Sequence, residues 1–235
     1  MSIRRDTLSV LRSIRPDVLG ALLVATIGVD LLDLAAPPND DIGVSDVIAV
    51  IIRVVIVFSA SYAVQRQLAG GAQPFRPTIA MARFAVLQLL LLAGYGLATK
   101  LGVIFQGTGE VPLATQWLFG FLALAFYALF TIRLLAWNAA LAMGEPFSTL
   151  SEIWRRQAGH LGAIGGAYIA LILPVTAIHL AMTLVSLRIV MTANLRLALA
   201  LVDGLFQALE LGLACALGVV AWRIATAIEA GPPPR

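Results

Sequence analysis

Three polar residues that could do chemistry lie inside the last long apolar stretch of the chain. Asp203, Gln207 and Glu210 follow one another at i, i+4 and i+7, so on a helix their side chains share one face. The preceding apolar stretch carries a polar face of its own, formed by Thr176, His179, Thr183 and Ser186. We expect the two faces to meet inside the protein, with Arg133 of an earlier stretch as the partner of Glu210.

Two kinds of chemistry fit these polar faces. Ionisable residues inside membrane spans often form proton or ion paths, in which His179, Asp203 and Glu210 would be the titrating groups. The other interpretation is a structural network of hydrogen bonds between helices, each contributing about 1 kcal/mol or less. We favour the structural network, and the ion path stays open as the alternative.

A second set of charges lies near one end of the first two apolar stretches. Asp30 and Arg53 each lie about 10 Å from that end, at about 1.5 Å of helix per residue. Antiparallel neighbouring helices would bring the two side chains together, with Asp33 as a second acceptor. We interpret the three residues as a structural ion pair that fixes the first helical hairpin. The alternative is an ion or proton site.

Small residues form a stripe on the stretch that carries Asp203. They recur at every fourth position, which lets a neighbouring helix backbone approach closely: Gly204, Ala208, Gly212 and Ala216. We expect a second close-packing surface at the start of the preceding stretch, formed by Gly162, Gly165, Gly166 and Ala170. Farther along that stretch, Pro174 predicts a kink.

Few residues suit a metal or a cofactor. His160 and His179 are the only histidines and lie about 28 Å apart along one helix, too far to hold one haem or one zinc ion. Cys215 is the only cysteine, which excludes an intrachain disulfide. The sequence contains no zinc-protease, serine-hydrolase or nucleotide-binding motif. We therefore expect no cofactor and no metal, and we favour a protein that is not an enzyme.

The composition indicates that helices in a membrane position these residues. Of 235 residues, 60% are hydrophobic and only 12% are charged, and the mean hydropathy is +0.93. A soluble domain carries about 25% charged residues, so a soluble globular fold is excluded. Backbone polar groups in hydrocarbon need internal partners, so the apolar stretches should be helices. The predicted fold class is an all-α polytopic membrane protein with about six transmembrane helices, at 17–36, 45–68, 79–105, 113–142, 160–187 and 198–228.

Arginines at the ends of these stretches predict the orientation. With a cytoplasmic N-terminus, eleven of them lie on the cytoplasmic side: Arg4, Arg5, Arg12, Arg15, Arg66, Arg76, Arg83, Arg155, Arg156, Arg223 and Arg235. The other side holds only Arg188 and Arg196, so both termini should be cytoplasmic. The basic pI of about 9.5 thus reflects orientation and not nucleic-acid binding.

The predicted organisation is a single membrane domain with short flanking segments. A cytoplasmic segment occupies 1–16, the six-helix domain 17–229, and a proline-rich tail 230–235. The arginine-rich, lysine-poor composition is typical of a GC-rich bacterial genome. The predicted location is therefore the bacterial inner membrane.

The loop before the fifth stretch has the pattern of an amphipathic helix, near 148–158. Ser148 or Ser151 can cap its start, and Trp154 is followed by Arg155 and Arg156. Such a helix is expected in the cytoplasmic interface of the membrane, with the tryptophan at headgroup depth.

Residues 120–180 resemble a known group of bacterial membrane proteins. With Arg133 in the preceding stretch, Trp154, Arg155 and Gly159 give a pattern similar to uncharacterised multi-pass proteins related to the membrane domain of glycerophosphodiester phosphodiesterases. The resemblance covers about a quarter of the chain. It implies a helical membrane module of about six spans. It does not carry over the phosphodiesterase activity, because this sequence holds no such catalytic domain.

Three functions fit these features. We favour a non-enzymatic accessory module that binds another membrane protein or lipid, which the small-residue stripes and the interfacial helix indicate. The alternative is a small ion-coupled transporter or permease that uses the polar faces of the fifth and sixth stretches. The third is a lipid-modifying membrane enzyme. The expected partners are the lipid bilayer and another membrane protein or a second copy of the chain, and not nucleic acid.

Overall fold

The computed structural model describes residues 2–35, 44–104, 113–186 and 192–227. Within these ranges the backbone is helical apart from short connections, and it contains no strand. The predicted all-α class is therefore confirmed. The proline-rich tail predicted at 230–235 lies outside the described residues.

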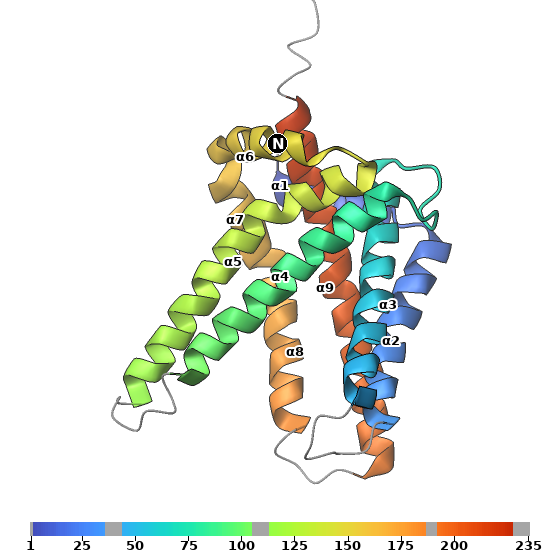
Figure 1. Cartoon of the computed structure of the whole chain (residues 1–235), viewed down its shortest axis with the longest axis vertical. Coiled ribbons are helices and arrows are strands. Elements are labelled where there is room, and N and C mark those ends of the chain that lie inside the picture. The colour runs from blue at the N-terminus through green and yellow to red at the C-terminus, as the bar shows by residue number, and fades with distance from the viewer. Residues whose placement is uncertain (1, 36–43, 105–112, 187–191, 228–235) are drawn as a thin grey trace, which may run out of the picture.

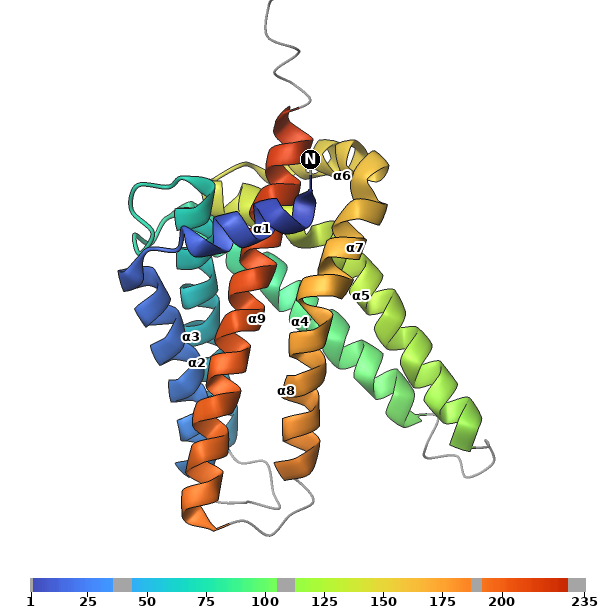
Figure 2. The same ribbon diagram turned by 180° about the vertical axis from the view of Figure 1, so that it is seen from behind.

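The described chain forms a bundle of α-helices that run back and forth between two ends (Figures 1 and 2). Helices α1 and α6 lie at one end, which we call the α1–α6 end. Short 3-10 turns, η1 at Phe147–Thr149 and η2 at Ala158–His160, flank α6. The helices are α1 (Ile3–Arg12), α2 (Pro16–Ala35), α3 (Val44–Ala69), α4 (Ile79–Ile104), α5 (Leu113–Met143), α6 (Leu150–Gln157), α7 (Leu161–Leu171), α8 (Leu173–Ser186) and α9 (Ala193–Ala227).

Several of these helices suit a membrane. The apolar segment Ile79–Gly94 is shorter than the four segments given at the end of this paragraph. Long apolar helices with few charges are typical of membrane spans, so the chain has the character of an integral membrane protein. Four segments of the described chain are long and apolar enough to cross a bilayer: Ile48–Ala69, Phe126–Met143, Phe147–His179 and Ala193–Ala227.

Helix α9 lies at the centre of the bundle and packs against α1, α2, α3, α5 and α8. It begins at Ala193, earlier than the predicted start at 198. Its stripe of small residues makes one of the closest of these contacts. A Cβ added at Gly204 would lie 2.7 Å from the Cα atom of Ile27 on α2, so no larger residue fits without a shift of the backbone. The other members of the stripe are also buried: Ala208, Gly212 and Ala216.

The glycine-rich start of the fifth stretch does not pack closely, and that prediction is wrong. A Cβ added at Gly162, Gly165 or Gly166 would meet no atom within 4 Å. The inward face of α7 carries Ile164 and Ala167 instead, which are fully buried. Glycine spacing alone does not show which face of a helix turns inward, and here the bulkier face does.

The predicted kink in the fifth stretch is confirmed. Ile172 separates α7 from α8, two residues before Pro174. Proline has no N–H group, so it cannot continue the helical ladder to the carbonyl of Ala170. The ladder resumes where the N–H of Thr176 donates to the carbonyl oxygen of Ile172 at 3.0 Å.

Helices α4 and α5 form a hairpin that diverges from the other helices away from the α1–α6 end (Figure 1). Among the described side chains of α5, the buried ones lie between Ile132 and Ala142. Farther from the α1–α6 end, Phe126 and Leu129 are 74% and 67% exposed. The hairpin is therefore anchored to the bundle mainly near the α1–α6 end.

The N-terminal segment expected as a cytoplasmic extension contains a packed amphipathic helix. Helix α1 buries Ile3, Thr7 and Val10 and contacts α7 and α9. The sequence analysis treated this segment only as a source of positive charge. Its apolar residues Ile3, Val10 and Leu11, at i, i+7 and i+8, were the signal that could have predicted the helix.

Helix α6 fills most of the range in which an interfacial helix is predicted. Leu150, Ile153 and Gln157 face the bundle and are buried. The serine cap is a wrong prediction, because Ser148 and Ser151 are exposed and no side-chain hydrogen bond caps the start of α6. The turn η1 leads directly into α6 and takes the place of a cap.

Candidate functional site

The polar faces of α8 and α9 meet as predicted. The Nδ1 atom of His179 lies 2.6 Å from the Oδ1 atom of Asp203. Closer to the α1–α6 end, the hydroxyl of Thr176 donates to the Oε1 atom of Glu210 at 2.7 Å. Each carboxyl group on α9 thus has a hydrogen-bonding partner on α8. The side chains of Thr183 and Ser186 lie outside the described residues.

Helix α2 extends this polar cluster on the other side of α9. The side-chain amide of Gln207 donates to the Oδ1 atom of Asp30 at 2.9 Å, and Asp30 is only 9% exposed. The sequence analysis missed this contact and paired Asp30 with Arg53 alone. That ion pair stays a prediction, and the side chain of Asp33 lies outside the described residues. We call the set Asp30, Thr176, His179, Asp203, Gln207 and Glu210 the polar cluster.

Arg133 lies elsewhere, so its predicted pairing with Glu210 is wrong. Its guanidinium carbon lies 4.0 Å from the ring centre of Trp154, and its Nη2 atom donates to the carbonyl oxygen of Trp154 at 3.3 Å. Arg133 and Glu210 lie at different depths in the bundle. Leu135, two residues after Arg133, contacts α9 at Gly218. Glu210 lies about 12 Å farther along α9.

The carboxyl groups of α9 bond to a histidine and a threonine on α8. No lysine or arginine among the described side chains pairs with Asp203 or Glu210. An ionised carboxyl group in an apolar surrounding is costly unless it is paired. His179 and Thr176 therefore supply the hydrogen bonds that these carboxyl groups need in an apolar surrounding.

The helices of this chain do not fully cover the cluster. The side chains of His179 and Asp203 are 28% and 21% exposed. Exposed apolar residues surround the pair, with Ile178 at 46%, Leu205 at 50% and Val202 at 42%. A partly exposed hydrogen-bonded pair thus lies in an otherwise apolar surface of α8 and α9.

The predicted interfacial residues divide between two environments. Trp154 faces α5, where its ring centre lies 5.5 Å from that of Trp137 and 6.2 Å from that of Phe130. The expected position of Trp154 at headgroup depth stays a prediction. Arg155 is 77% exposed, and Arg156 pairs with Glu152 at 2.6 Å. Helix α6 packs its tryptophan against α5 and exposes Arg155, whereas Arg156 is mostly buried and donates to the carbonyl oxygen of Ala225 on α9.

Arginines at the α1–α6 end bond to the ends of neighbouring helices. Arg66 donates to the carbonyl oxygen of Ala142 at 3.0 Å, and Arg223 donates to that of Leu68 at 2.8 Å. These carbonyls belong to the last turns of α5 and α3, which have no helical donors of their own. The sequence analysis missed this role, because it depends on which helix ends lie side by side.

Metal-binding groups are sparse in the described part of the chain. No three His, Cys, Asp or Glu side chains come together there in a way that could hold a metal ion. Cys215 is buried, and its thiol lies 3.8 Å from the carbonyl oxygen of Ser61. The polar cluster is therefore the strongest candidate for a functional site.

Comparison of the chain with protein-family models, curated protein sequences and solved structures found no match. No residue role can therefore be transferred from a relative. The resemblance to the membrane domain of glycerophosphodiester phosphodiesterases, carried by Arg133, Trp154, Arg155 and Gly159, stays a prediction. The function has to be argued from the geometry of the site.

Proposed function

We propose that this chain is a non-enzymatic accessory protein that binds another membrane protein. In this proposal six segments span the bacterial inner membrane: α2, α3, α4, α5, α7 with α8, and α9. The α1–α6 end faces the cytoplasm, because Arg66, Arg83 and Arg223 lie there whereas Arg196 lies at the opposite end. Both termini are then cytoplasmic.

The observation that carries the proposal is the partial exposure of His179 and Asp203. Hydrogen-bonding side chains that face hydrocarbon are costly, and membrane helices bury them against one another. The apolar surroundings and the central polar pair resemble the contact surface of a membrane helix that recognises a partner. A transmembrane helix of another protein would cover the pair and supply a further hydrogen-bonding group.

A photo-crosslinking residue placed at Ile178 tests this proposal in native membranes. Ile178 lies next to His179, and Ile169 on α7 serves as the control because it is also exposed, at 58%. We expect the probe at Ile178 to capture one membrane protein in stoichiometric amount, and the probe at Ile169 not to capture it. The Asp203→Leu variant should abolish that capture. Crosslinks to lipid alone from Ile178 would contradict the proposal.

A second candidate is an ion-coupled transporter, which the contacts of His179 and Glu210 favour. The two carboxyl groups on α9 bond to the imidazole ring of His179 and the hydroxyl of Thr176. Rows of such hydrogen-bonding groups occur in proton-coupled transporters. The same exposure that would admit a partner helix would also admit water. Proton flux into liposomes that contain the purified protein tests this candidate. Flux that is lost in Glu210→Gln would support transport over the accessory role.

A further inference from the structure

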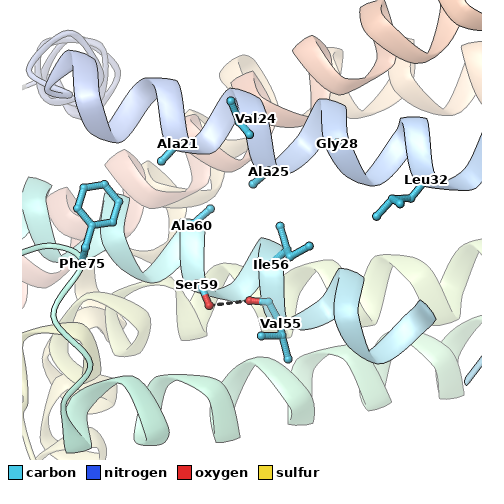
Figure 3. Close-up of a pocket in the computed structure, with 10 residues that line it drawn as sticks. All are labelled: Ala21, Val24, Ala25, Gly28, Leu32, Val55, Ile56, Ser59, Ala60 and Phe75. Atoms are coloured by element: carbon cyan, nitrogen blue, oxygen red, sulfur yellow. Dashed lines mark hydrogen bonds between the residues drawn. The ribbon is translucent and has the colours of Figure 1, made fainter. Parts of the chain in front are cut away.

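An apolar groove lies between α2 and α3, away from the polar cluster. Its volume is about 680 Å³. Figure 3 shows small residues on both walls and the ring of Phe75, from the α3–α4 connection, near the end formed by Ala21 and Ala60. Val24 and Val55 are 74% and 56% exposed, so the groove opens on the outer surface of the bundle.

The chemistry of the groove selects an apolar occupant. Its one hydroxyl group, that of Ser59, already donates to the carbonyl oxygen of Val55 at 2.7 Å (Figure 3). The remaining lining side chains are aliphatic or aromatic, and Gly28 has none. An occupant would therefore gain apolar contacts and would find no side-chain hydrogen-bonding group available.

The dimensions of the groove fit a single hydrocarbon chain. From Ala21 to Leu32 it follows α2 for about 16 Å, close to half of the bilayer's hydrocarbon thickness of about 30 Å. An acyl chain of one leaflet matches this length.

Positive charge lies at the mouth of the groove. Arg76 follows Phe75 directly, is exposed, and donates to the side-chain oxygen of Gln73 at 3.2 Å. It pairs with no carboxylate among the described side chains. Arg15 precedes α2 at the same end and is half exposed beside Asp17. Anionic headgroups are attracted to such arginines at the cytoplasmic surface.

We propose that the α2–α3 groove binds one acyl chain of an anionic phospholipid from the leaflet at the α1–α6 end, with the headgroup at Arg76. The inference rests on the proposed orientation in the membrane but not on the accessory role. Changes at Gly28 and Arg76 test lipid binding, whereas changes at Ile178 and Asp203 test partner capture. Either proposal can therefore fail without the other.

Two glycines of α2 provide a matched test. A Cβ added at Gly28 or at Gly20 would meet no atom within 4 Å, but only Gly28 lines the groove. Delipidated protein would be titrated with phosphatidylglycerol or phosphatidylcholine and followed by native mass spectrometry. We expect Gly28→Leu to weaken phosphatidylglycerol binding about tenfold, as loss of apolar contact for two methylene groups predicts. Gly20→Leu should bind like the unchanged protein.

Further variants keep the test decisive. Ser59→Leu fills the groove from α3 and should have the effect of Gly28→Leu, which covers the case in which one variant does not fold. Arg76→Gln should remove the preference for phosphatidylglycerol over phosphatidylcholine, and Arg196→Gln at the opposite end should not. Equal binding by Gly28→Leu, Ser59→Leu and the unchanged protein would overturn the proposal. Equal binding of the two lipids would also overturn it.

Discussion

The two halves of the bundle are held together in different ways. Toward the α1–α6 end, α9 is buried almost without interruption from Gly212 to Ala221. Toward the opposite end, Leu201, Val202 and Leu205 on the same helix are 40–50% exposed. The half near the α1–α6 end is a close-packed core, and the opposite half is a set of helices with open faces.

The polar interactions follow the same division. In the close-packed half, arginines bond to the last carbonyls of α3 and α5 and tie helix ends together. In the open half, hydrogen bonds between side chains connect the middles of α2, α8 and α9. Close packing fixes the relative positions of helices by shape. Apart from the close α2–α9 contact at Gly204, the open half depends on weaker contacts that a partner can change.

The largest expected effect comes from breaking the close-packed half at Gly218. A Cβ added there would lie 2.6 Å from the carbonyl oxygen of Leu135 and 2.8 Å from the side-chain nitrogen of Gln65. The backbone carbonyl of α5 has little freedom to move, so Gly218→Ala should lower the free energy of unfolding by about 3 kcal/mol. Thermal or denaturant unfolding in detergent measures the change.

The control is Gly20→Ala, because an added Cβ at Gly20 meets no atom within 4 Å. It experiences the same gain in helix propensity without the collision. An equal free energy of unfolding in Gly218→Ala and Gly20→Ala would show that α5 and α9 are not in close contact at Gly218. It would also remove the basis for the comparison between the halves.

An intermediate effect is expected when an arginine that links helix ends is removed. Arg66 donates to the carbonyl oxygens of Ala142 and Gln73 and to the hydroxyl of Tyr62. Arg66→Met keeps an unbranched apolar stem and loses all three bonds, so stability should fall by about 2 kcal/mol. Denaturant unfolding would measure this loss of stability. Arg196→Met in the open half should lower the stability much less. A loss of the same size in both variants would mean that the bonds at the α1–α6 end add nothing specific.

The sequence predicted the faces of single helices better than the contacts between helices. The stripe containing Gly204 and the polar face containing Asp203 follow from 3.6-residue periodicity, which is a property of one helix. The contact between Gln207 and Asp30 joins residues 177 positions apart. It depends on which helices are neighbours, and periodicity does not contain that information.

Arg133 and α7 show why the remaining predictions were wrong. Arg133 suits a carboxylate partner by charge, but its depth in the bundle places it over the ring of Trp154. Gly162 and Gly166 suit a close helix contact by size, but their face of α7 meets no neighbour within 4 Å of an added Cβ. Charge and size limit what a residue can contact. The bundle geometry decides what it does contact.

The smallest expected effect tests the open half, through the bond between Thr176 and Glu210. A double-mutant cycle with Thr176→Val and Glu210→Leu isolates the interaction between the two side chains from their other contacts. Hydrogen bonds between membrane helices contribute about 0.6 kcal/mol on average, so the coupling energy should be near that value. It would be measured by unfolding in detergent, as for Gly218→Ala. A coupling as large as the Gly218→Ala effect would show that the polar cluster holds the open half as firmly as close packing holds the other. In that case the α8–α9 surface would be a rigid structural contact, and the argument that it stays adaptable for a partner would fail.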